Sequence, residues 1–180
     1  MVTNNNLTDR QRVRLAQLAY QQWHLGEKVY LDRGWYYLGK VEQIIHREDA
    51  LHLTVVVNRQ ANEASLLFRG STGIISGGRD NWVKQWLRTN FPVGSDIITG
   101  ERDIPDQLLS ASKVLNELMQ EYPTTKFWLY GHSLGSINAQ YALADCRFPQ
   151  QLAQSFLYEG PNIYWLLSAE QRKRALQIRC

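Results

Sequence analysis

A glycine–x–serine–x–glycine turn between an apolar run and a helix-forming run is the feature that most limits the folds open to this chain. Residues 126–130, Lys-Phe-Trp-Leu-Tyr, predict a buried strand; the turn runs from Gly131 to Gly135, and residues 136–146 predict a helix. A strand that passes directly into a helix is typical of a parallel sheet with helices on its faces. The two glycines avoid collisions with the neighbouring strand and helix, while the central serine sits on a sharp, strained bend.

The rest of the chain continues the alternation of strands and helices. A hairpin is predicted from two runs rich in β-branched and aromatic residues, 35–45 and 51–57, with a polar stretch between them. The remaining patterns predict strands at 64–68 and 154–158 and helices at 9–23 (capped by Thr8 or Asp9), 82–87, 106–122 and 165–177. We therefore predict an α/β fold whose mostly parallel central sheet carries an N-terminal antiparallel hairpin and flanking helices.

Composition is consistent with one globular domain over residues 1–180. The chain is 44% hydrophobic and 21% charged, with a formal charge of +3. The basic residues gather near the two ends without an aromatic–basic motif, so we interpret them as solvated helix faces and expect no nucleic-acid partner. No C-x-x-C or other metal-like spacing occurs. We expect neither a metal nor a cofactor.

Two cysteines and the N-terminus bear on the location of the protein. Cys146 lies among apolar helix positions and is predicted to be a buried thiol, whereas Cys180 is predicted to be exposed. Such a pair favours a reducing compartment. The first nine residues are polar and contain no apolar signal core, and the apolar runs are too short to span a bilayer. We expect a cytoplasmic protein without stable membrane insertion.

Ser133 in the turn is the candidate nucleophile. An exposed hydroxyl on such a bend attacks acyl carbons when a base removes its proton. The Leu134 N–H, at the start of the following helix, is placed to donate to the developing oxyanion, which the helix dipole also favours. The alternative is a plain strand-to-helix turn in which the serine only caps the helix.

A second candidate site follows the strand at 64–68. That strand ends at Arg69-Gly70-Ser71, and a hydroxyl and an N–H at a strand end can form the other half of an oxyanion hole. The alternative is that Ser71 merely caps a turn.

Together, Phe68-Arg69-Gly70-Ser71 and the segment Gly131–Gly135 resemble the class 3 lipase family, an α/β-hydrolase group. The resemblance implies an α/β-hydrolase-like fold, with Ser133 as nucleophile and Ser71 and Leu134 as oxyanion donors. Ser71 replaces the family's usual threonine and keeps the hydroxyl. The resemblance is closer still to a bacterial branch of these lipase-like proteins and covers about residues 7–170. Beyond the two specific motifs it rests on looser similarity in the helix before the serine turn and in Leu18-Ala19-Tyr20, Asp80-Asn81-Trp82 and Tyr158-Glu159-Gly160-Pro161.

No histidine follows Ser133, although the family order is serine, then acid, then histidine. All four histidines precede it: His24, His46, His52 and His132. His132 is expected to point away from the Ser133 hydroxyl, His24 to end a helix, and the other two to flank the hairpin. Among the acids that follow, Glu159 ends a strand at the sheet edge where ligands bind, so it is a candidate triad acid or substrate-pocket carboxylate. The alternative is an ordinary carboxylate at the start of a loop.

The simplest interpretation is that the family's last strands are absent, so that the fold is C-terminally incomplete. An uncovered sheet edge would then favour homo-oligomers. The predicted function is a lipase/esterase-like serine hydrolase of small-molecule or lipid carboxylic esters, acting through an acyl-enzyme at Ser133 and impaired by the missing histidine. The alternatives are a catalytically silent hydrolase-fold binding module or remnant, and a thioesterase or peptidase.

Overall fold

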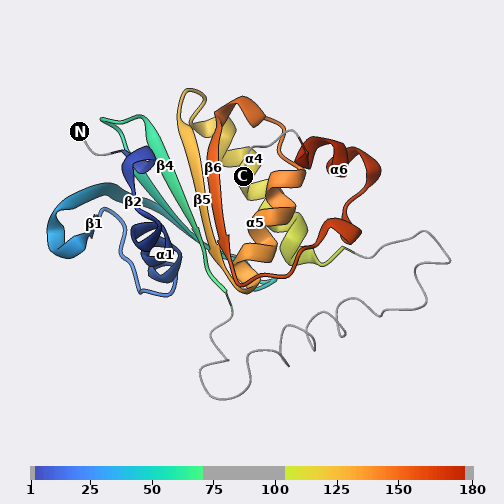
Figure 1. The fold of residues 1–180 in the computed structure, drawn as a ribbon, viewed down its shortest axis with the longest axis horizontal. Helices are drawn as coiled ribbons and strands as arrows, with labels where there is room; N and C mark the ends of the chain where they lie inside the picture. The colour runs from blue at the N-terminus through green and yellow to red at the C-terminus, as the bar shows by residue number, and fades with distance from the viewer. Residues whose placement is uncertain (1–2, 71–103, 177–180) are drawn as a thin grey trace, which may run out of the picture.

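The computed structural model describes residues 3–70 and 104–176, and its centre is a six-stranded sheet (Figure 1). The strands lie in chain order, so each pairs with its neighbours in the sequence. β1 to β4 run antiparallel to one another, whereas β4, β5 and β6 run parallel. The sheet is therefore mixed, and its antiparallel part is larger than the predicted hairpin. The strands are β1 Lys28–Leu31, β2 Tyr36–His46, β3 His52–Asn58, β4 Glu63–Phe68, β5 Lys126–His132 and β6 Leu152–Tyr158.

Helices cover both faces of this sheet (Figure 1). One face is covered by α1 (Asp9–Leu18), which contacts β5 and β6. The other face is covered by α4 (Asp106–Glu121) and α5 (Leu134–Ala144), and α6 (Ala169–Ala175) packs against α5. The described residues also form the 3-10 helices η1 Asn4–Asn6, η2 Asp32–Gly34, η3 Pro149–Gln151 and η4 Tyr164–Leu166.

Side chains of the central strands alternate between two cores, one on each face. In β5, Phe127 and Leu129 join the core beneath α4 and α5, whereas Trp128 and Tyr130 join the core beneath α1. This alternation is the two-residue period of an extended strand. None of the four side chains is more than 2% exposed. Burial of one apolar side chain of this size stabilises the fold by about 1.5–3 kcal/mol.

α1 begins where the sequence predicts and ends earlier. Thr8 and Gln11 form a capping box, which confirms the first of the two predicted caps. The helix ends at Leu18 rather than at Trp23, because the Leu18 carbonyl oxygen accepts from the Gln21 N–H (3.1 Å) and from the Trp23 ring nitrogen (2.9 Å). These bonds close a turn in place of a further helical turn.

The predicted helix at 165–177 is also shorter in the structure. Trp165 lies in η4, and α6 begins only after Ser168. Ser168 forms a capping box with Gln171, so the side chain that starts the helix lies three residues past the predicted start. The helix at 106–122 and the hairpin are confirmed by α4 and by the β2–β3 pairing.

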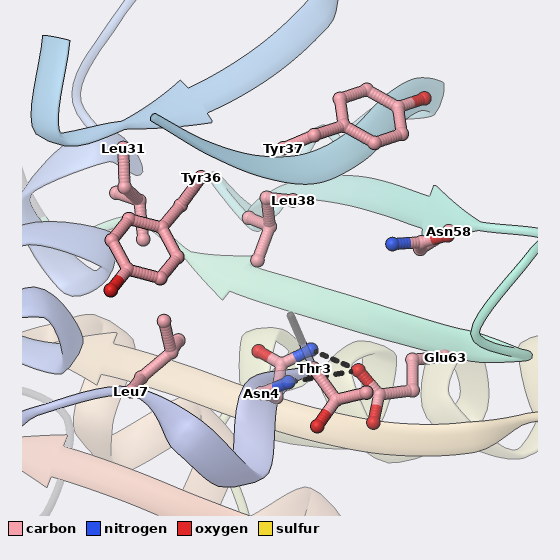
Figure 2. A pocket seen from close by; sticks show the side chains of 9 residues that line it. All are labelled: Thr3, Asn4, Leu7, Leu31, Tyr36, Tyr37, Leu38, Asn58 and Glu63. Carbon is pink, nitrogen blue, oxygen red and sulfur yellow. Dashed lines mark hydrogen bonds between the residues drawn. The ribbon is translucent and has the colours of Figure 1, made fainter. Parts of the chain in front are cut away.

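A buried polar cluster fixes the N-terminal segment at the start of β4. Asn4 is 2% exposed; its backbone N–H and its side-chain Nδ2 donate to the Glu63 carboxylate at 3.0 and 2.8 Å (Figure 2). The Asn4 Oδ1 accepts from the hydroxyls of Tyr130 (2.8 Å) and Ser65 (3.2 Å). The small pocket in Figure 2 adjoins this cluster. Because Glu63 begins a parallel strand and Ser133 follows one, the pocket lies at the sheet edge opposite Ser133.

Replacing Asn4 with leucine is expected to lower the free energy of unfolding by about 2–4 kcal/mol. Glu63 is 7% exposed and would lose its amide donor, while the Tyr130 and Ser65 hydroxyls would lose their acceptor. Denaturant unfolding measures the change. The double variant Asn4→Leu/Glu63→Leu should lose less than the sum of the single variants, because no unpaired buried carboxylate remains. Strictly additive losses would show that the pair is not coupled.

Candidate active site

Ser133 occupies the turn between β5 and α5, as the sequence predicts. Its backbone has φ 55° and ψ −123°, a positive-φ conformation that costs a residue with a Cβ about 1–3 kcal/mol. Its N–H donates to the Tyr158 carbonyl oxygen of β6 at 2.9 Å, and its own carbonyl oxygen accepts from the Ser136 N–H at 3.0 Å. These bonds hold a strained residue at the carboxyl edge of the parallel strands.

The two glycines of the turn are required by close backbone contacts. A Cβ on Gly131 would lie 2.7 Å from the carbonyl oxygen of Gly135. A Cβ on Gly135 would collide with the carbonyl oxygen of Phe68, at the end of β4. The expectation that side chains here would strike the neighbouring strand and helix is confirmed, and it explains how α5 packs so closely on the sheet.

A mixed sheet covered on both faces, with a serine on a strained strand-to-helix turn beside the parallel strands, decides the fold class. The chain has an α/β-hydrolase-like fold. In such a fold the carboxyl edge of the parallel strands is where ligands bind.

Leu134 is the first residue of α5. Its N–H therefore has no acceptor within the helix, because the first four N–H groups of an α-helix lack intrahelical partners. The partial positive charge of the helix N-terminus lies at the same place. An oxygen that gains negative charge beside Ser133 would be stabilised there, which is chemically what an oxyanion hole supplies. The role of Leu134 as a donor stays a prediction.

His132 lies next to Ser133 in sequence, and both of its ring nitrogens have other partners. Nδ1 lies 2.9 Å from the Tyr20 hydroxyl, and Nε2 lies 3.1 Å from the Glu159 carboxylate. The Tyr20 ring also meets the imidazole edge-on, with centroids 5.8 Å apart. Neither nitrogen is available to the Ser133 hydroxyl, in agreement with the expectation that this side chain points elsewhere.

Glu159 follows β6 at the same sheet edge as Ser133. Its backbone also has a positive φ, 54°, and its Oε2 binds His132. The next residue, Gly160, is pressed against the start of α5, since a Cβ there would lie 3.1 Å from the Ser133 carbonyl oxygen and would collide with the Ser136 side chain. The structure thus joins Glu159 to His132; its role as a triad acid stays a prediction.

His46 and His52 face each other across the β2–β3 hairpin, with ring centroids 4.4 Å apart. β3 is antiparallel to β4, so this pair lies at the same sheet edge as the end of β4, where the Arg69 N–H donates to the His52 carbonyl oxygen. Burial, followed by the charges of His46 and Arg69, lowers the pKa of His52. His52 is therefore neutral at neutral pH. Within residues 3–70 and 104–176, no hydrogen bond joins either imidazole to Ser133.

His24 does not cap a helix, contrary to expectation. α1 ends at Leu18 with Ala19 as its C-cap, and the His24 side chain is 87% exposed beside Glu27. Cys146 is 3% exposed, which confirms the predicted buried thiol.

Ser71, the predicted helix at 82–87 and Cys180 lie outside the described residues. The residues just before Ser71 are described: a Cβ on Gly70 would lie 2.8 Å from the His132 carbonyl oxygen and would collide with the Tyr20 hydroxyl. The end of β4 is therefore in direct contact with the serine turn. Tyr20 is the site residue that the sequence did not reveal as one, because its position near an apolar helical stripe predicts only packing.

No family model matches the chain, and no curated protein sequence matches it. Among solved structures, it is similar to a triacylglycerol lipase from Penicillium expansum, with 17% identity and a TM-score of 0.46 over 93% of this chain and 63% of that chain. It is also similar to a mutant of MDLA from Penicillium cyclopium, with 19% identity and a TM-score of 0.46 over 88% of this chain and 63% of that chain. A fungal lipase in complex with an inhibitor has 20% identity and a TM-score of 0.40 over 62% of this chain and 42% of that chain. The chain thus spans less than two thirds of each of these proteins.

No helix in residues 3–70 or 104–176 is long and apolar enough to cross a bilayer. In the same part of the chain, no three histidine, cysteine, aspartate or glutamate side chains gather as a set of metal ligands.

Proposed function

We propose that this chain is a lipase/esterase-like serine hydrolase that cleaves small-molecule or lipid carboxylic esters. The observation that carries the proposal is the backbone of Ser133, at φ 55° and ψ −123° directly before the N-terminus of α5. Strain of this kind persists only where the surrounding structure holds it, and it is concentrated at functional sites. A hydroxyl residue needed only as a helix cap adopts an unstrained extended conformation, as Thr8 and Ser168 do in this protein.

In the proposed reaction, the Ser133 Oγ attacks the acyl carbon of the ester while a base takes its proton. The carbonyl oxygen becomes an oxyanion that the Leu134 N–H stabilises, with the Ser71 hydroxyl and N–H as the second source of donors. Collapse of this intermediate breaks the bond to the alcohol, which leaves with a proton, and forms an acyl-enzyme at Ser133. Attack by water on the acyl-enzyme releases the carboxylic acid.

One observation favours a second candidate, a catalytically silent module with the hydrolase fold. Among the described residues, no histidine nitrogen bonds to the Ser133 hydroxyl, and His132 is fully engaged by Tyr20 and Glu159. A serine without a base is a weak nucleophile. The two candidates predict different reactivity of the same side chain.

Covalent labelling by a fluorophosphonate probe separates them, because the probe needs a reactive serine but no deacylation step. We expect the probe to label the wild-type chain, with the adduct on Ser133 in the mass spectrum of the digested protein. Ester turnover is measured on the same preparation with p-nitrophenyl esters of increasing chain length.

Two variants complete this test. Ser133→Ala should lose both labelling and turnover, whereas Ser110→Ala, on α4, should keep both. A folded wild-type chain that takes no label and turns over no ester would refute the hydrolase and support the silent module.

A further inference from the structure

We propose that Tyr20 and Glu159 are positioning residues for the reaction at Ser133, acting through His132; this rests on the proposed hydrolase function. They form a continuous chain of hydrogen bonds from the Tyr20 hydroxyl to His132 Nδ1 (2.9 Å) and from His132 Nε2 to the Glu159 carboxylate (3.1 Å). These hydrogen bonds bring together residues that are far apart in the sequence: Tyr20 and His132 are separated by 112 positions, and His132 and Glu159 by 27. Glu159 then serves the residue before the nucleophile rather than a triad base.

The direction of each bond follows from the chemistry of the three groups. A carboxylate only accepts, so His132 Nε2 carries the proton in that bond. In the neutral imidazole Nδ1 is then an acceptor, and the Tyr20 hydroxyl donates to it. Burial raises the pKa of Tyr20, so its hydroxyl keeps the proton that this bond needs. The backbone of Gly70 also lies against the Tyr20 hydroxyl, since a Cβ on Gly70 would collide with the Tyr20 oxygen.

These hydrogen bonds and contacts join the segments that surround Ser133. Tyr20 follows α1, Gly70 follows β4, His132 ends β5, and Glu159 follows β6. Ser133 itself is bonded to β6 through its backbone N–H, which donates to the Tyr158 carbonyl oxygen at 2.9 Å. The His132–Glu159 bond therefore adds a side-chain link just beyond the last paired residues of β5 and β6, and the contact of Gly70 with Tyr20 places the end of β4 beside it.

Two of the joined strand ends are strained, which explains why they need such support. Ser133 and Glu159 follow the paired residues His132 and Tyr158 at the ends of parallel strands, and both have positive φ values, 55° and 54°. Neither is a glycine, so each stores conformational energy that neighbouring contacts must offset. Without the hydrogen bonds from Tyr20 and Glu159 to His132, we expect the Ser133 hydroxyl to spend less time in the geometry required for attack. Even a small misplacement of a nucleophile lowers the reaction rate strongly.

Tyr20→Phe removes only the hydroxyl and is the primary test. It should lower kcat, or the rate of fluorophosphonate labelling, by about 5–10-fold with KM changed by less than twofold, since the loss is one neutral hydrogen bond. Glu159→Ala should lower kcat by a similar or larger factor, and Glu159→Gln should restore most of it, because the amide oxygen can still accept from His132. Tyr30→Phe is the matched control, because this half-exposed tyrosine of β1 lies far from the turn in the fold.

A second readout does not depend on catalysis. Nitrogen NMR of the imidazoles should show His132 with a protonated Nε2 and an acceptor Nδ1, and Tyr20→Phe should shift Nδ1 while leaving His24 unchanged. Unchanged kcat in both Tyr20→Phe and Glu159→Ala, or a rise in KM alone, would overturn the inference. Absence of turnover and labelling in the wild-type chain would instead refute the proposed function, and the imidazole spectrum would still decide whether the hydrogen bonds exist.

Discussion

Replacing Ser133 with glycine is expected to remove ester turnover and to make the protein more stable at the same time. Turnover should fall by at least about 10³-fold because the nucleophile is gone. Glycine adopts φ 55° without strain, which relieves about 1–3 kcal/mol. The greater freedom of glycine in the unfolded chain costs about 0.4–1 kcal/mol. The net expectation is a gain of roughly 0.5–2 kcal/mol in the free energy of unfolding.

Ser133→Ala is the matched control for this prediction. It removes the same hydroxyl and keeps the Cβ, so turnover should fall equally while the backbone strain remains. Chemical denaturation of the three proteins under one condition gives the comparison. If Ser133→Gly proved less stable than Ser133→Ala, the turn would not be strained, and the main argument for a functional serine would fail.

Replacing Gly135 with alanine is expected to lower the free energy of unfolding by at least about 3 kcal/mol, the upper range for overpacking. Position 135 lies in the first turn of α5, where alanine is a better helix former than glycine by up to about 1 kcal/mol. That gain is outweighed because the new methyl group would collide with the Phe68 carbonyl oxygen, which is backbone and cannot rotate away. α5 would have to move off the sheet, and labelling of Ser133 should be lost with it.

Gly26→Ala gives the comparison for Gly135→Ala. Gly26 has φ +80°, yet nothing lies within 4 Å of the position of a Cβ there. Alanine at this position bears only the conformational cost of a left-handed residue, about 1–2 kcal/mol. Thermal or denaturant unfolding should therefore rank Gly135→Ala as clearly the less stable. Equal losses would mean that the contact between α5 and the end of β4 is looser than the structure indicates.

The serine turn could be predicted from the sequence because its signals are local. The apolar run before Gly131, the two glycines and the helix-forming run after Gly135 lie within one short segment, and β5 and α5 follow them. The hairpin and α4 were predictable for the same reason, since hydrophobic period and breakers lie inside each element.

Other parts of the fold depend on contacts that the sequence does not reveal. β1 has only four residues and two buried side chains, Val29 and Leu31, and it is defined by its pairing with β2. The end of α1 depends on the Trp23 ring nitrogen returning to the Leu18 carbonyl oxygen. A helical stripe that reaches Trp23 carries no signal of that bond, so the predicted helix was five residues too long.

The surroundings of Ser133 were the hardest to predict. From its position in the sequence, Glu159 could be predicted to lie near Ser133 at the carboxyl ends of the parallel strands. The sequence did not reveal that its carboxylate bonds to His132. The Tyr20 contact joins residues more than a hundred positions apart, and an aromatic residue after a helix predicts only packing. Pairings of this kind are determined by the way α1, β5 and β6 pack together.

The most direct measurement is a crystal structure of the chain after reaction with a fluorophosphonate. We expect a covalent bond from phosphorus to the Ser133 Oγ and a phosphoryl oxygen within hydrogen-bonding distance of the Leu134 N–H, with Ser133 still at positive φ. An adduct on a different residue would rule out Ser133 as the nucleophile, and a phosphoryl oxygen directed away from the N-terminus of α5 would rule out Leu134 as an oxyanion donor.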